Sequence, residues 1–216
     1  MTDYSNRRVM MVDTQVRPSD VTKFPIIAAM LAVARENFVP ADKRETAYMS
    51  ENIDLGGGRV LMEPRSFAKL LDALDIQPAE LTLDIGCGFG YSTAVLARLC
   101  ETVVGVETES LGAGAQSALS EQGVDNAAIM TGELALGAPK HGPYDVIVLQ
   151  GAVEFIPDTI LAQLKEGGRI GAIFMEGALG VARIGYKMGT TITWRFSFNA
   201  SAPVLLGFGK TLSFAL

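Results

Sequence analysis

Histidine and cysteine are nearly absent from this sequence, which has one histidine and two cysteines in 216 residues. The two cysteines, Cys87 and Cys100, are too few for a disulfide framework and lack the spacing of metal ligands. A single histidine, His141, argues against a histidine-based metal site or a catalytic triad, and we expect it to lie at the surface. We therefore expect no metal and a reducing compartment.

Long apolar runs and an excess of basic residues are also missing. No segment approaches the roughly 20 consecutive apolar residues that span a bilayer, and residues 1–18 do not resemble a signal peptide. The formal net charge is −6, with 18 basic residues scattered along the chain, whereas nucleic-acid binding usually requires clustered lysine and arginine. We expect a cytoplasmic protein without a membrane or nucleic-acid partner.

The apolar content of 49% is that of a globular protein with a large core. From residue 81 onward, apolar strands alternate with helices: we predict strands at 81–85, 102–106, 127–130, 145–149 and 169–175, and helices at 93–97, 111–122 and 158–165. This pattern predicts an α/β fold with a doubly wound, mostly parallel, Rossmann-like sheet. Two further strands, at 190–198 and 209–216, predict an antiparallel hairpin at the sheet edge.

The first 75 residues follow a different pattern. An apolar helix is predicted at 25–34 and a second at 65–74, with Pro64 in its first turn. Between them, Gly56-Gly57-Gly58 requires a loop or turn. We predict an N-terminal helical extension with a substrate-side loop, residues 1–75, and a nucleotide-binding domain, residues 76–216, within one compact unit.

A glycine-rich loop follows the strand at 81–85. Gly86, Gly88 and Gly90 allow a sharp bend and a close approach of the backbone to a ligand. A dinucleotide fingerprint needs a glycine at position 91, where this chain has Tyr91. The observed spacing is G-x-G-x-G, with Asp84 two residues before the first glycine, which suits the amino group of S-adenosylmethionine better than a pyrophosphate.

Glu107 ends the next strand, where a carboxylate can accept both hydroxyls of a ribose. Asp84 and Glu107 would then hold opposite ends of one extended ligand. Two alternatives stay open: a glycine-rich turn that binds nothing, and a nicotinamide cofactor. Cys87, inside the loop, is explained by a small side chain that faces the cofactor.

Two later segments complete the predicted site. Gly132 and Glu133 follow the third strand, where Glu133 either accepts from the adenine amino group or is a solvated loop acid. Gln150 and Glu154 follow the fourth strand, at the edge where open α/β sheets bind ligands, and are candidates for lining the site of methyl transfer.

Pieces along most of the chain resemble the protein-L-isoaspartate O-methyltransferase family, within the class I S-adenosylmethionine-dependent methyltransferases. They are Arg35-Glu36-Asn37-Phe38-Val39-Pro40, Ala47-Tyr48, the segment from Gly56 to Pro64, the loop from Asp84 to Ser92, Val106-Glu107, Gly132-Glu133, Pro143-Tyr144-Asp145-Val146-Ile147 and the segment from Gln163 to Arg169. The resemblance implies methylation of isoaspartyl carboxyl groups in damaged proteins, which begins their repair. It implies S-adenosylmethionine as the cofactor, S-adenosylhomocysteine as the product, and a substrate pocket between residues 58–64 and 150–154.

One position departs from the family. Its loop resembles Gly-Gln-Thr-Ile-Ser-Gln/Ala-Pro, whereas this chain has Gly58-Arg59-Val60-Leu61-Met62-Glu63-Pro64. Met62 replaces the serine whose hydroxyl lies in the active site, and a thioether cannot donate a hydrogen bond. Two alternatives therefore accompany isoaspartyl repair: a methyltransferase of this fold for a small-molecule substrate, such as a carboxylate, and a non-catalytic homologue that binds the cofactor.

A carboxylate is already ionised near pH 7, so methyl transfer to it needs no general base, and we assign no catalytic acid or base. The protein would contribute alignment and desolvation. Arg59 is either a clamp for a substrate carboxylate, which a guanidinium can bind at two points, or a solvent-exposed loop residue.

Overall fold

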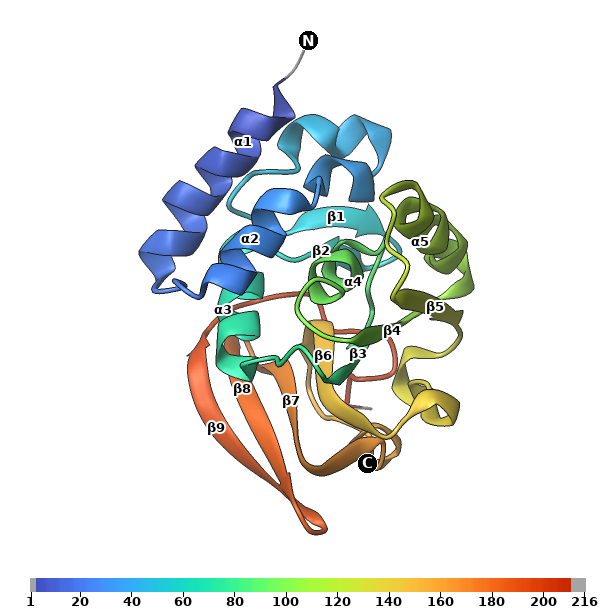
Figure 1. Ribbon diagram of the computed structural model, residues 1–216. Coiled ribbons are helices and arrows are strands. Elements are labelled where there is room, and N and C mark those ends of the chain that lie inside the picture. Colours follow the sequence, from blue (N-terminus) through green and yellow to red (C-terminus); the bar gives the residue numbers. More distant parts are fainter. Residues whose placement is uncertain (1–2, 211–216) are drawn as a thin grey trace, which may run out of the picture.

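A seven-stranded sheet forms the centre of the part of the chain that the structure, a computed structural model, describes: residues 3–210 (Figure 1). Its strands are β3 (Leu81–Ile85), β4 (Thr102–Glu107), β5 (Ala127–Thr131), β6 (Tyr144–Val153), β7 (Leu164–Glu176), β8 (Leu179–Met188) and β9 (Thr191–Asn199), in the spatial order β5-β4-β3-β6-β7-β8-β9. The first five are parallel, and β8 is antiparallel to both neighbours. The predicted doubly wound, mostly parallel sheet with antiparallel C-terminal strands is confirmed.

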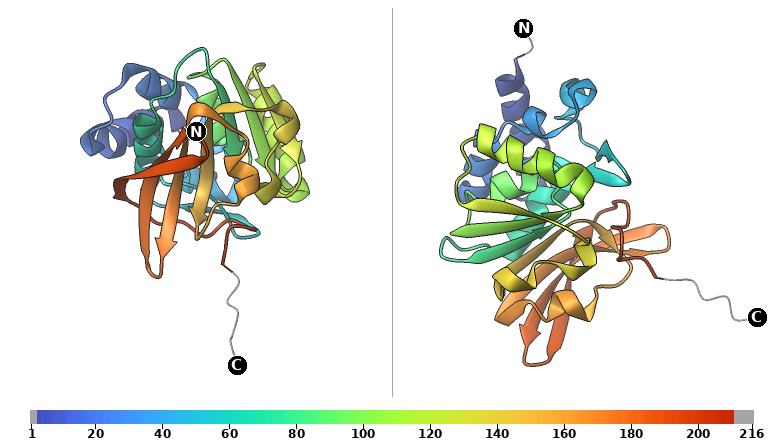
Figure 2. Two further views of the ribbon diagram at one scale, coloured as in Figure 1. Left: turned by 90° about the horizontal axis from the view of Figure 1, so that it is seen from below. Right: turned by 90° about the vertical axis from the view of Figure 1, so that its right-hand side faces the viewer.

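The central strands are apolar on both faces because each face is covered. In β6, Val146 and Val148 face one core, and Ile147 and Leu149 face the other, since alternate side chains point to opposite sides of a strand. All four are fully buried. Figure 2 shows the N-terminal helices and α5 on one side of the sheet and the segment around α6 on the other.

The N-terminal third consists of short helices and one hairpin. Its elements are α1 (Tyr4–Met11), which continues through a π-helical turn (Val12–Val16) and a 3-10 turn (Arg17–Ser19), then α2 (Phe24–Ala32), 3-10 turns at Arg35–Phe38 and Ala41–Thr46, the hairpin of β1 (Ile53–Gly56) and β2 (Arg59–Leu61), and α3 (Pro64–Leu74). Met30 and Phe67 pack in the same core as Val146 of the sheet. The two parts thus share one core, and the division at residue 75 stays a prediction.

The helices that connect the strands are α4 (Tyr91–Leu96), α5 (Glu109–Glu121) and α6 (Asp158–Leu161), with 3-10 turns at Leu134–Leu136 and Pro139–His141. Leu119 of α5 packs with the N-terminal helices, and Ile160 of α6 packs on the opposite face. Within the described residues, no helix is both long and apolar enough to cross a bilayer.

Two details of the predicted elements are wrong. The helix at 158–165 ends at Leu161, and β7 begins at Leu164. Gly167 and Gly168 therefore lie within β7. Gly167 has a positive φ of 74°, at a point where the register between β6 and β7 shifts, so the glycines form a bulge in the strand.

The C-terminal hairpin pairs different strands from those predicted. β9 pairs with β8, which the sequence did not indicate because Gly180, Arg183, Gly185 and Lys187 interrupt its apolar pattern. Of the second predicted strand, 209–216, residues 209 and 210 are not in a strand, and the remainder lies outside the described residues.

Candidate cofactor and active site

The candidate site lies at the carboxyl edge of the sheet, between β3 and β6. These strands are neighbours, but the chain leaves β3 toward β4 and β5 on one side and continues from β6 to β7 on the other. Open α/β sheets bind ligands at such a switch point. Asp84, Gly86, Glu107 and Gln150 all lie at this edge, as the sequence predicts.

The glycine loop makes the bend for which its glycines were singled out. Gly86, Gly88 and Gly90 have φ values of 79°, 59° and 94°, in the left-handed region that favours glycine. A Cβ on Gly88 would lie 2.6 Å from Leu55 Cδ1 of β1. The N-terminal hairpin therefore lies directly against the loop, as the predicted substrate-side segment should.

Asp84 is fully buried at the end of β3 and ties the loop together. Its carboxylate accepts hydrogen bonds from Ser92 Oγ and Thr93 Oγ1 at the start of α4, both at 2.7 Å, and from Gln150 Nε2 of β6 at 2.8 Å. Burial raises the pKa of Asp84 to about 6, against the lowering effect of these three donors. Both oxygens accept hydrogen bonds within the protein, so Asp84 orders the loop, and its contact with the amino group of the cofactor stays a prediction.

This buried carboxyl group gives a prediction for stability against pH. Its pKa of about 6 in the folded protein lies above the unfolded value of 3.8, so the folded state binds the proton more tightly. The group therefore stabilises the protein below about pH 4, and this contribution is lost as the pH rises to about 6. The difference amounts to something on the order of 3 kcal/mol.

Urea unfolding of the wild type and of Asp84→Asn across pH 4 to 7 measures this contribution, because asparagine cannot titrate. We expect the free energy of unfolding of the wild type to fall relative to that of the variant as the pH rises. A constant difference between the two proteins over that range would contradict the assignment.

Glu107 ends β4 and is fully buried. Its Oε2 accepts hydrogen bonds from the Gly88 N–H at 2.7 Å and from Arg59 Nη2 at 3.1 Å, and its Oε1 accepts from the Thr108 N–H at 2.8 Å. Arg59 Nε lies 3.3 Å from each oxygen. The predicted ribose acceptor is thus held against the glycine loop and paired with a cation.

Arg59 is not a solvent-exposed loop residue, so that alternative is wrong. It is the first residue of β2, directly after the Gly56-Gly57-Gly58 turn, and it is 4% exposed. The hairpin directs its side chain into the site, where it pairs with Glu107 and donates a hydrogen bond from Nη2 to the Gly86 carbonyl.

The other predicted residues differ in how close they come to this centre. Met62 is buried, and its carbonyl accepts a hydrogen bond from Arg35 Nη2 at 2.6 Å. Glu154 accepts a hydrogen bond from the Lys210 backbone.

The Gly132 N–H donates to the Glu107 carbonyl at 3.0 Å, but the Glu133 side chain is exposed. Cys87 and Gly90 lie in the loop itself.

Burial raises the pKa of the Cys87 thiol, which leaves it neutral. Its Sγ lies 3.4 Å from the position that a Cβ on Gly105 would take. The thiol therefore packs against β4, the strand that ends in Glu107. His141 is exposed, as expected.

Sequence reasoning missed three parts of the site. Ser92 and Thr93 were detectable, because serine and threonine hydroxyls close to a buried acid can donate hydrogen bonds to it. Leu205 had no such signal. The segment from Pro203 to Phe208 bonds to the end of β6, through Ala152 N–H to the Pro203 carbonyl and Leu205 N–H to the Ala152 carbonyl, and its Leu205 covers Gly86 and Gly151.

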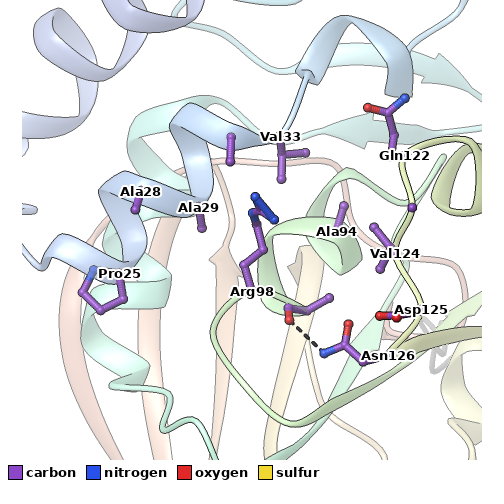
Figure 3. Close-up of a pocket in the computed structure, with 13 residues that line it drawn as sticks. Pro25, Ala28, Ala29, Val33, Ala94, Arg98, Gln122, Val124, Asp125 and Asn126 are labelled. Carbon is purple, nitrogen blue, oxygen red and sulfur yellow. Dashed lines mark hydrogen bonds between the residues drawn. The ribbon is translucent and has the colours of Figure 1, made fainter.

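A separate hollow of about 700 Å³ lies between α2, α4 and the loop that precedes β5 (Figure 3). Ala29 and Ala94 line it, together with Arg98 and Asn126, and none of its lining residues belongs to the glycine loop. It adjoins the amino end of β5, opposite the edge where Glu107 lies. Its position does not suit the cofactor.

Comparison with known proteins identifies the relatives of this chain. A model of the family described as protein-L-isoaspartate(D-aspartate) O-methyltransferase matches residues 7–174. The protein-L-isoaspartate O-methyltransferase 2 of Pelobacter propionicus is 35% identical over 185 residues, which cover 83% of this chain and 82% of that protein. The protein-L-isoaspartate O-methyltransferase of Opitutus terrae is 35% identical over 167 residues, covering 77% and 72%.

Two solved structures share the fold. A structure of a protein-L-isoaspartate O-methyltransferase matches with a TM-score of 0.81 at 22% identity, covering 96% of this chain and 67% of that one. A structure from Plasmodium falciparum, described as a protein-L-isoaspartate O-methyltransferase in complex with S-adenosyl-L-homocysteine, matches with a TM-score of 0.78 at 17% identity, covering 95% and 99%.

Proposed function

Since the chain belongs to the protein-L-isoaspartate O-methyltransferase family, whose members are S-adenosylmethionine-dependent methyltransferases, we propose that it methylates the carboxyl group of isoaspartyl residues in proteins and peptides. The observation that carries the proposal is the carboxyl edge of β3 and β4, where the glycine loop and the buried Glu107 carboxylate meet. With a net charge of −6, a nucleic acid is not the expected substrate. We place the activity in the cytoplasm.

The residues present suit the cofactor in kind. Gly86 and Gly88 carry no Cβ over the loop, where Arg59, Leu205 and Leu55 now lie, and Glu107 offers a carboxylate at the position of a ribose. We propose that Gly86, Cys87, Gly88 and Gly90 approach the ligand through the backbone. Glu107 accepts from the ribose, Gly132 and Glu133 border the adenine, and Asp84 keeps the loop in shape.

When bound, S-adenosylmethionine supplies a methyl group on a sulfonium, which a carboxylate can attack directly. The ionised substrate needs no proton removed, so the chain contributes alignment and exclusion of water. We propose that Gln150 and Glu154, at the carboxyl end of β6, line the substrate side. The carboxylate clamp predicted for Arg59 requires its guanidinium to leave Glu107, with which it is now paired.

A second function is favoured by Met62. Met62 lies between β2 and α3 and its side chain is buried, so the chain has a thioether where the family pattern has a hydroxyl. A methyltransferase of this family with a small-molecule carboxylate as its substrate would need no such hydroxyl. A non-catalytic homologue that binds the cofactor is the third possibility.

Transfer of labelled methyl groups to an isoaspartyl peptide separates these functions, with the matching aspartyl peptide as the control. We expect transfer to the isoaspartyl peptide alone. We also expect Met62→Ser to raise kcat/KM by about tenfold, roughly the value of one hydrogen bond to a charged group. Binding of S-adenosylhomocysteine without transfer to either peptide would reject the isoaspartyl substrate and leave the cofactor site intact.

A further inference from the structure

The Arg59 guanidinium occupies the position at which Glu107 would receive a ribose. Two of its nitrogens, Nε and Nη2, lie 3.1 to 3.3 Å from the carboxylate oxygens of Glu107. Adjacent N–H donors directed at one carboxylate present the same pattern as the two neighbouring hydroxyls of a ribose. Arg59 therefore satisfies the group that is expected to recognise the cofactor.

The same side chain fills the space over the glycine loop. A Cβ added to Gly86 would lie 2.3 Å from Arg59 Nη2 and 3.3 Å from Leu205 Cδ2. Arg59 Nη2 also donates a hydrogen bond to the Gly86 carbonyl. The absence of a Cβ at Gly86 thus lets the Arg59 side chain lie against the loop, with Leu205 beside it.

Burial strengthens the ion pair between Arg59 and Glu107, in addition to the short distance between them. The Arg59 side chain is 5% exposed and that of Glu107 is fully buried, so water screens their attraction little. A ligand that binds Glu107 has to separate the two charges or expel the guanidinium into another contact. Arg59 stands where the family pattern has a glutamine, which carries no charge to hold it at Glu107.

We propose that Arg59 is an internal ligand of the cofactor site, which competes with the ribose of S-adenosylmethionine for Glu107 and must be displaced before the cofactor binds. Displacement lowers the apparent affinity, because only the fraction of molecules with Glu107 free is competent to bind. It also frees the guanidinium on the hairpin that faces the substrate side. The proposal rests on the cofactor of the proposed function, but not on the substrate.

Calorimetric titration with S-adenosylhomocysteine tests this competition. We expect Arg59→Gln to bind at least tenfold more tightly than the wild type. Arg59→Lys keeps the charge but lacks the bidentate donor geometry, so its affinity should fall between those of the wild type and Arg59→Gln. Arg65→Gln is the matched control, because Arg65 lies on α3 next to the hairpin with a half-exposed side chain and no contact with Glu107; its affinity should equal that of the wild type.

Thermal unfolding gives a second measurement that is independent of activity. Without ligand, Arg59→Gln should unfold at a lower temperature than the wild type, because Glu107 is left without its counter-ion. Saturating S-adenosylhomocysteine should raise its Tm more than that of the wild type, as tighter binding requires. If Arg59→Gln does not fold, the comparison is between Arg59→Lys and the wild type, and tighter binding of S-adenosylhomocysteine by Arg59→Lys supports the proposal.

Equal or weaker binding by folded Arg59→Gln, or by Arg59→Lys where that variant decides, would overturn the proposal. The result is separable from the substrate assay. Tighter binding by the variant together with no isoaspartyl transfer would keep Arg59 as an internal ligand and reject the proposed substrate. Isoaspartyl transfer together with unchanged affinity of the variant for S-adenosylhomocysteine would keep the proposed substrate and reject Arg59 as an internal ligand.

Discussion

Replacing Glu107 by alanine is expected to lower the free energy of unfolding by about 3–5 kcal/mol, because it leaves the buried Arg59 guanidinium without its counter-ion. The Gly88 and Thr108 N–H groups lose their acceptor as well. Under the proposed function, the affinity for S-adenosylhomocysteine should fall by about 100-fold, which corresponds to two hydrogen bonds from the ribose. Chemical denaturation and calorimetry measure the two effects.

The double variant Arg59→Gln with Glu107→Ala is the control for this stability effect. It removes both charges, so it should be more stable than Glu107→Ala alone, although it contains one more substitution. If the two substitutions destabilise additively, the ion pair contributes nothing and the account of Arg59 is wrong. A Glu107→Ala variant that keeps wild-type affinity would remove Glu107 from the cofactor site.

Replacing Gly86 by alanine should cost about 3 kcal/mol of stability, the second-largest effect that we expect. An alanine at position 86 has to keep the left-handed conformation of Gly86, at φ 79°, which costs about 1–2 kcal/mol. Its Cβ would also lie 2.3 Å from Arg59 Nη2, so the guanidinium has to move away from Glu107. Equilibrium unfolding in urea measures the loss.

Gly123 provides the matched control. Its φ of 67° is also in the left-handed region, but a Cβ there would meet no atom within 4 Å. Gly123→Ala should therefore carry the backbone cost alone, and the difference between the two variants reports the close approach of Arg59. Equal losses at the two positions would show that Arg59 is not held against the loop.

The sheet could be predicted because its strands carry the signal in their own residues. β3, β4 and β6 are nearly continuous apolar runs, as strands buried on both faces must be. β8 escaped prediction because its stability comes from pairing with β7 and β9, and its own sequence mixes glycines and cations with apolar residues. β8 follows β7 and precedes β9 through tight turns, but strand propensity depends on such pairing and leaves little trace in a local pattern.

The candidate site shows the same division. The positions of Asp84, Gly86 and Glu107 follow from local spacing after two strands, and the structure brings them to one edge. The partners of Arg59 could not be predicted, because 48 residues separate it from Glu107 and only the path of the hairpin joins them. Leu205 reaches Gly86 through the C-terminal segment, whose irregular backbone has no periodicity to read.

The most direct test of the account is a crystal structure of the protein with S-adenosylhomocysteine. We expect the ligand at the carboxyl edge of β3 and β4, both ribose hydroxyls within hydrogen-bond distance of the Glu107 carboxylate, and the Arg59 guanidinium displaced from it. An Arg59–Glu107 pair still intact, with the ligand bound elsewhere, would contradict the central claim that Glu107 receives the cofactor.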